Sequence, residues 1–242
     1  MTAPAAVGFT GFRREALRFL SDLEKNNDRE WFQPRKEQYE ELLRRPMALL
    51  VERINADLAK YAPDYVTEPS KSIYRIYRDT RFSPNKTPYK THIGALLWHK
   101  RLEKNQTAAL YFHLSTKEVL IASGIYKPLP EVLLAMRQHI AENHERLRAI
   151  LRRKAVRDTL GELQGDALSR PPKGWPADHP AMDLLKRKDL LLEITLKPAV
   201  ALGPTMLAEL NKCFRLMTPF VDFLNEPLLK RRARPKDPLF VE

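Results

Sequence analysis

Four segments rich in strand-forming residues follow one another in the middle of the chain with no helical pattern between them. They are residues 72–78, 92–99, 108–116 and 118–124, and residues 189–196 form a similar segment further on. Parallel strands need a long crossover connection, usually a helix, so strands joined by short loops predict an antiparallel meander. We therefore expect an α+β fold, with a meander sheet of four to five strands flanked by N-terminal and C-terminal helices.

Helical periodicity lies on both sides of this central region. Residues 12–23 place apolar side chains at i, i+4, i+7, i+8 and i+11, which form one face of a helix. Further helices are expected at residues 34–45, 46–60, 130–142, 144–154 and 206–224. No repeat or long linker divides the chain. We expect a single domain over residues 1–229, followed by a basic, flexible tail at residues 230–242.

The composition is that of an ordinary folded protein. The 242 residues are 43% hydrophobic and 30% charged. Cys213 is the single cysteine, so no internal disulfide can form, and its place in an amphipathic helix predicts a small core residue. The first residues lack the order of a signal peptide, and no apolar run approaches the length of a membrane span. These features predict a cytoplasmic protein that does not contact the membrane.

Positive charge is concentrated in one part of the chain. The formal net charge is +12, and residues 71–104 contain nine basic and two acidic side chains, a net charge of +7. Charge focused in one place attracts an anion better than the same charge spread over a surface. The alternative is that a basic chain is merely soluble, because net charge bears on solubility and association and not on fold.

Residues 75–90, hereafter the cationic loop, contain most of this charge. Arginine offers a planar fork of donors, lysine a point charge and tyrosine a hydroxyl, and these groups suit phosphate or carboxylate. The side chains expected to bind such an anion are Arg75, Arg78, Arg81, Lys86, Tyr89 and Lys90. The alternative is a structural loop held by its own ion pairs, such as Asp79 with Arg78 or Arg81, above packed Phe82 and Tyr89.

Two further segments combine polar and aromatic residues. Residues 26–32 (Asn-Asn-Asp-Arg-Glu-Trp-Phe) indicate a helix cap whose aromatic side chains anchor it to the core. Residues 172–180 contain Lys173 and His179 in a proline-rich loop, which would close over a ligand. The alternative for this second segment is a proline-braced surface loop.

The titratable groups suggest acid–base candidates and no metal site. Asp79, His113 and His179 are the candidate general acids or bases of an enzyme. His113 alternates with Tyr111 on a predicted strand, so the two side chains share a face. No histidine pair has the H-E-x-x-H spacing or another metal-binding spacing, so we predict no metal site. The sequence indicates no particular cofactor or oligomeric state.

Four motifs in the same order resemble the bacterial and fungal family known as domain of unknown function 2461. The motifs lie at residues 26–32, 78–91, 123–128 and 172–180, and the resemblance extends from about residue 9 to about residue 227. In the first motif, Asp28 is one residue more than the family pattern Asn-Asn-Arg-Glu-Trp-Phe contains. The family implies no activity. It implies that the cationic loop and the other three motifs belong to one recurring design.

Three functions agree with these observations. The first is binding of a phosphate-bearing or other anionic partner, a nucleotide or nucleic acid, through the cationic loop. The second is an enzyme that acts on a phosphorylated or carboxylated small molecule. The third is a scaffold protein in which the loop is structural. Convergence of the candidate groups on one cleft would favour an enzyme over a binding module.

Overall fold

The computed structural model describes residues 8–81 and 83–233 of the chain. Strands β1 (His92–Trp98), β2 (Ala109–Ser115), β3 (Val119–Ile125) and β4 (Leu190–Leu196) form an antiparallel sheet in the order β1-β2-β3-β4. The predicted α+β meander is therefore confirmed, with four strands. Phe82 and residues 234–242 of the predicted tail lie outside the described residues.

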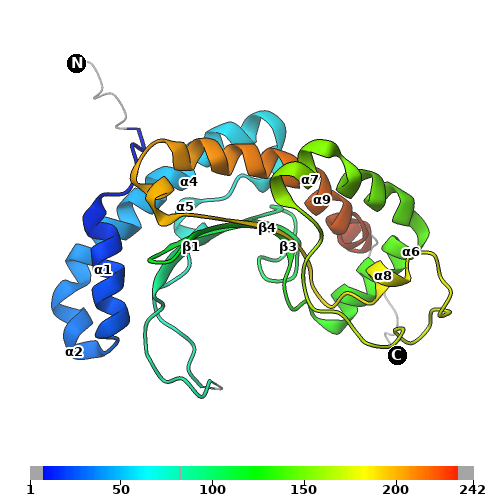
Figure 1. Cartoon of the computed structure of the whole chain (residues 1–242), viewed down its shortest axis with the longest axis horizontal. Coiled ribbons are helices and arrows are strands. Elements are labelled where there is room, and N and C mark those ends of the chain that lie inside the picture. The colour runs from blue at the N-terminus through cyan, green and yellow to red at the C-terminus, as the bar shows by residue number, and fades with distance from the viewer. Residues whose placement is uncertain (1–7, 82, 234–242) are drawn as a thin grey trace, which may run out of the picture.

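Helices cover one face of the sheet (Figure 1). The long helices α4 (Arg45–Tyr61) and α9 (Thr205–Ala233) lie across this face, and the opposite face is concave. The strand register places the buried side chains of Ala95, Phe112 and Ile121 side by side on the covered face. The ring of Phe112 lies 6.2 Å from that of Phe214 in α9. The hydrophobic core therefore occupies the space between this face and the helices.

The N-terminal helical region is more continuous than predicted. After α1 (Arg14–Lys25), helical backbone runs without a break from residue 29 to residue 61. The predicted boundary at Pro46 is absent because the π-helical turn η2 (Glu40–Arg44) leads directly into α4. Pro46 occupies the first turn of α4, where its missing N–H costs little. The shorter elements in this region are α2 (Arg29–Phe32), η1 (Gln33–Arg35), α3 (Lys36–Tyr39) and η2.

The C-terminal helices also differ from the predicted boundaries. Helix α6 (Pro130–Arg152) is kinked at Asn143, whose backbone is non-helical, so the predicted break between residues 142 and 144 is confirmed as a kink. Helix α9 continues past Pro227 to Ala233, because Leu228 beyond the proline is buried in the core. The remaining elements are α7 (Lys154–Leu160), which was not predicted, α8 (Met182–Leu185) and η4 (Pro198–Leu202). Within the described residues, no helix combines the length and apolarity needed to cross a membrane.

The strand predicted at residues 72–78 does not form as a regular strand. Its first residue ends the short helix α5 (Pro69–Ser72), which follows η3 (Pro63–Tyr65). The rest is extended but changes partner, with one bridge from Ile73 to Ala95 of β1 and another from Tyr77 to Tyr89. A segment that divides its hydrogen bonds in this way cannot build a continuous ladder.

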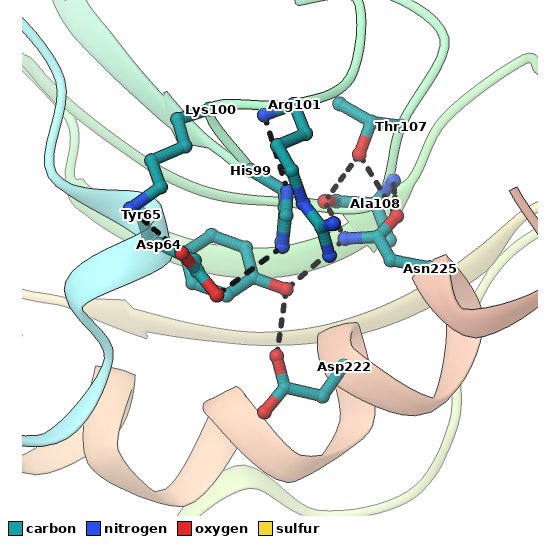
Figure 2. Close-up of polar contacts among 9 residues, drawn as sticks. All are labelled: Asp64, Tyr65, His99, Lys100, Arg101, Thr107, Ala108, Asp222 and Asn225. Atoms are coloured by element: carbon teal, nitrogen blue, oxygen red, sulfur yellow. Dashed lines mark hydrogen bonds and ion pairs between the residues drawn. The ribbon is translucent and has the colours of Figure 1, made fainter. Parts of the chain in front are cut away.

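A buried asparagine joins α9 to the start of β2 (Figure 2). The Asn225 side chain is fully buried. Its Oδ1 accepts hydrogen bonds from Thr107 Oγ1 at 2.8 Å and from the Ala108 N–H at 2.9 Å. Its Nδ2 donates to the Ala108 carbonyl at 2.9 Å and to the Tyr65 hydroxyl oxygen at 3.0 Å. All four hydrogen-bonding positions of the amide are therefore used.

The network around Asn225 continues to the surface through Tyr65 (Figure 2). The Tyr65 hydroxyl donates to Asp222 Oδ1 at 2.9 Å. The neighbouring Asp64 carboxylate pairs with Lys100 at 2.9 Å and lies 3.6 Å from the buried His99 ring. Polar groups from η3, from the loop between β1 and β2 and from α9 thus satisfy one another, as buried polar groups must.

Substitution Asn225→Ala should destabilise the fold strongly. It leaves the buried Ala108 N–H without a partner and removes one hydrogen bond each from the Ala108 carbonyl and the Tyr65 hydroxyl, so we expect the free energy of unfolding to fall by about 3 kcal/mol. Urea denaturation measures this change. Lys212→Ala on the exposed side of the same helix should change the value by less than about 0.5 kcal/mol. Equal effects of the two substitutions would show that the hydrogen bonds of Asn225 do not stabilise the fold.

Candidate functional site

The cationic loop projects from the sheet as a short two-stranded ribbon (Figure 1). The Lys90 N–H donates to the Ile76 carbonyl at 2.8 Å, and the Arg78 N–H donates to the Pro88 carbonyl at 2.9 Å. Pro88 has no N–H of its own, so the ladder cannot continue as a full strand pair. The ribbon leads into β1 and therefore ends beside the open face of the sheet.

The segment at residues 26–32 holds this ribbon in place. The Asn27 side chain donates to the Tyr89 carbonyl and accepts from the Tyr89 N–H, both at 3.0 Å, as a neighbouring strand would. The Phe32 ring stacks on the Tyr89 ring with 4.2 Å between centroids. Asp28 caps α2 by accepting from the Trp31 N–H at 2.8 Å. The predicted capping and anchoring role of this segment is confirmed, and its target is the cationic loop.

Several loop cations are engaged within the loop itself. The Arg78 guanidinium donates to the Thr87 carbonyl at 3.2 Å and also to the Thr87 hydroxyl. Lys86 Nζ donates to the Thr80 carbonyl at 3.0 Å. Arg81 pairs with Asp79 at 2.8 Å, and hydrogen bonds from Arg81 lower the pKa of Asp79 to about 2. Asp79 is therefore ionised at neutral pH.

Two hollows lie beside the ribbon and share Lys90 and His92 as part of their walls. The larger, which we call the sheet cavity, has a volume of about 550 Å³ and lies on the open face. The smaller, which we call the loop hollow, has a volume of about 340 Å³ and lies between the ribbon and α1. Besides Lys90 and His92, its walls are Glu24, Asn27, Arg78, Asn85, Thr87, Tyr89 and Thr91.

The cations of the sheet cavity are partly shielded from water. Lys90 and Lys104 are half-buried, and their ammonium groups stand 5.2 and 4.8 Å from the ring centroid of Tyr74. Burial lowers the pKa of both lysines, and Arg75 and Lys104 lower that of Lys90 further. Within the part of the chain that the structure describes, neither ammonium forms an ion pair with a carboxylate. Each ammonium donates to a backbone carbonyl instead, Lys90 to that of Arg75 at 2.8 Å and Lys104 to that of Lys71. An anion placed beside them would therefore meet positive charge that no carboxylate neutralises.

A histidine and a tyrosine in the wall of the sheet cavity form a chain with a glutamate beside the cavity. His113 Nδ1 lies 3.1 Å from the Tyr111 hydroxyl, and Nε2 lies 3.4 Å from Glu118 Oε1. Burial lowers the pKa of His113, against the opposing influence of Glu118, and burial raises the pKa of Tyr111. The His92 ring lies 4.8 Å from that of His113. Burial, His113 and Lys90 lower the pKa of His92 to about 4.

The structure brings together only part of the predicted site. Arg78, Tyr89 and Lys90 line the loop hollow, and Lys90 and His113 line the sheet cavity. Six other predicted residues line neither hollow. Lys173 is exposed on its loop, and His179 packs near His144, with 6.1 Å between ring centroids. The exposed Arg75 and Arg81 and the exposed Lys86 and Asp79 also line neither hollow.

Sequence reasoning missed His92 and Lys104 as components of the site. His92 begins a predicted strand, and the alternating pattern assigns it to one face of the sheet. The pattern does not show that this face contains a cavity. Lys104 comes from the loop between β1 and β2, and no local signal indicates that it folds over the ring of Tyr74. Among the residues described, no group of three or more His, Cys, Asp or Glu side chains is arranged to hold a metal ion.

A family model described as conserved hypothetical protein (DUF2461) matches residues 15–223. The match includes the cationic loop, the anchoring segment and the strands that form the sheet cavity. It is the family that the four sequence motifs resemble, so that resemblance is confirmed. No curated protein matches the chain.

Substitution Asn27→Ala should release the ribbon without unfolding the domain. The Tyr89 N–H donates to Asn27, so we expect hydrogen exchange at the Tyr89 amide to become at least about 10-fold faster, the equivalent of about 1.4 kcal/mol. Asn26→Ala is the matched control, because the exposed Asn26 side chain donates only to the Asp22 carbonyl at the end of α1. Unchanged exchange in Asn27→Ala would show that the stacked rings hold the ribbon alone.

Proposed function

Because the chain belongs to the conserved hypothetical protein family DUF2461, whose description assigns no activity, we propose its function from the geometry of the site: it binds a small organic anion. The charged group, a phosphate or carboxylate, lies against Lys90 and Arg78 in the loop hollow. The ring or apolar part of the ligand lies in the sheet cavity. The observation that carries this proposal is that Lys90 belongs to the walls of both hollows.

The chemistry of the two hollows supports such a ligand. The loop hollow offers Arg78 and Lys90 together with the hydroxyls of Thr87 and Thr91, which are donors suited to oxyanions. The sheet cavity is lined by tyrosine rings and aliphatic side chains, and its size is within the usual range for small-molecule sites. A nucleotide satisfies both requirements, with its phosphate in one hollow and its base in the other.

The burial of Tyr74 and Tyr89 favours a small molecule over a nucleic acid. Single-stranded nucleic acids bind along grooves where exposed aromatic rings stack successive bases. Here Tyr74 and Tyr89 are turned inward, and of the tyrosines in the cationic loop Tyr77 is the exposed one, at 42%. The anchoring of Tyr89 by Asn27 and Phe32 also supports a preformed site over a loop that adapts to a long partner.

Substitution Lys90→Met tests this proposal directly. We expect one or more nucleoside monophosphates, sugar phosphates or aromatic carboxylates to raise the melting temperature of the wild-type protein, at low and at high salt. Lys90→Met should weaken binding of that compound at least about 10-fold, because a charge-assisted hydrogen bond contributes about 1.5–3 kcal/mol. Lys173→Met, which changes a lysine exposed outside both hollows, is the matched control and should bind normally.

Two results would contradict the proposal. If only oligonucleotides shift the melting temperature, and high salt abolishes the shift, the cationic loop is a surface for nucleic acid. If none of these compounds has an effect, the loop is structural, as the third function considered from the sequence requires.

Anion binding should also take up protons under mildly acidic conditions. The folded pKa of His92 is about 4, below its ordinary value of 6.5, and an anion beside the ring would raise it. Affinity for sulfate, which does not titrate in this range, should therefore increase as the pH falls from 6.5 towards 4. Calorimetry in buffers of different ionisation enthalpy measures the uptake. His92→Gln should abolish it, and equal uptake in that variant would place the anion elsewhere.

A further inference from the structure

We propose that the wall of the sheet cavity is a proton relay, in which Tyr111 takes a proton from the bound organic anion and passes its own to His113. The relay rests on the proposed function for its substrate, an organic anion that carries an acidic proton. Tyr111 is the group that touches the substrate. His113 is the base behind it, and Glu118 positions and stabilises His113.

The two contacts of His113 determine how its protons are arranged. The imidazole nitrogen Nε2 faces the Glu118 carboxylate at 3.4 Å, so a neutral ring keeps its proton there. The other nitrogen, Nδ1, is then an unprotonated acceptor, and the Tyr111 hydroxyl 3.1 Å away must donate to it. This is the arrangement in which a carboxylate orients a histidine and the histidine activates a hydroxyl.

The remaining surroundings keep His113 neutral and largely buried. The His113 side chain is 12% exposed, and its charged or titratable neighbours are Glu118, Tyr111 and His92, with Lys90 close to His92. Burial lowers its pKa, so it is a free base at neutral pH. The Tyr74 ring packs edge-on to the Tyr111 ring at 6.2 Å between centroids.

A glycine in β1 makes room for these side chains. Gly94 pairs with His113 in the strand register. A Cβ atom at Gly94 would lie 3.0 Å from the Tyr111 hydroxyl and 3.0 Å from His113 Cβ. Any larger residue would therefore push the hydroxyl away from its position beside Nδ1.

The proton transfer balances within the residues of the cavity. The substrate proton moves to Tyr111 Oη as the phenolic proton moves to His113 Nδ1, which becomes an imidazolium beside the Glu118 carboxylate. Tyr111 is unchanged after the step. The electron pair left on the substrate makes it more negative, and the ammonium groups of Lys90 and Lys104 stabilise that charge. Return of the proton from His113 to solvent completes the cycle.

A sulfonyl fluoride measures whether Tyr111 is activated without requiring knowledge of the natural substrate. In this reaction Oη forms a bond to sulfur, fluoride leaves and the phenolic proton passes to His113. We expect 4-(fluorosulfonyl)benzoate, whose carboxylate suits Lys90 and Arg78, to label the wild-type protein at Tyr111, as located by peptide mass spectrometry. Tyr111→Phe should abolish the labelling.

The rate of Tyr111 labelling and its pH profile in Glu118→Gln test the role of Glu118. Glu118→Gln removes the charge that raises the pKa of His113, so labelling should be at least about 10-fold slower and its pH profile should move to lower pH. Glu145→Gln is the matched control, because Glu145 pairs with His144 outside the cavity. Labelling that falls on Tyr74 or Lys90, or a pH profile unchanged in Glu118→Gln, would overturn the relay.

Two further probes separate this inference from the proposed function. The unreactive 4-sulfamoylbenzoate tests anion binding alone, by its effect on the melting temperature. The neutral benzenesulfonyl fluoride tests the activation of Tyr111 alone. If the first binds and neither fluoride labels Tyr111, the relay is wrong and anion binding stands. If benzenesulfonyl fluoride labels Tyr111 in a Glu118-dependent way and 4-sulfamoylbenzoate does not bind, the activation of Tyr111 by His113 and Glu118 stands and the anion site is wrong.

Discussion

Helices α4 and α9 pack on the same face of the meander sheet, so each strand sends half of its side chains into the core and half onto an open face. On β2, Phe112 enters the core while Tyr111 and His113 line the sheet cavity. The alternation that builds the core therefore also builds the site. The positions of these polar groups depend on strand register, which is more rigid than a loop.

The site also depends on the contact between residues 26–32 and the cationic loop. A single amide side chain replaces a neighbouring strand for Tyr89, and a stacked ring fixes the Tyr89 side chain. The ribbon can then present Lys90 to two hollows without belonging to the sheet. This contact gives a physical reason why the motifs at residues 26–32 and 78–91 occur together: the side chains of the first motif bind the backbone and the ring of Tyr89 in the second.

The fold was largely predictable because its signals are local. Strand-forming composition and short connections identified β1 to β3, composition alone identified β4, and apolar periodicity identified the long helices. The failures have particular causes. Residues 72–78 have the composition of a strand but divide their hydrogen bonds between two partners, and Pro227 does not end α9 because Leu228 is buried beyond it. For the site, local charge singled out Lys90 and Arg78, but it also singled out Arg81 and Lys173, because sequence does not show which cations face a hollow.

Lys90 has one ammonium group and stands in the walls of two hollows. Whatever neutralises that ammonium from one side weakens the field on the other side. Two separate anions, one in each hollow, would therefore bind with negative cooperativity, and linkage requires the penalty to be the same whichever arrives first. A single molecule that spans both hollows avoids this penalty. Because the two hollows share Lys90, one ligand long enough to reach both hollows should bind better than two short ligands.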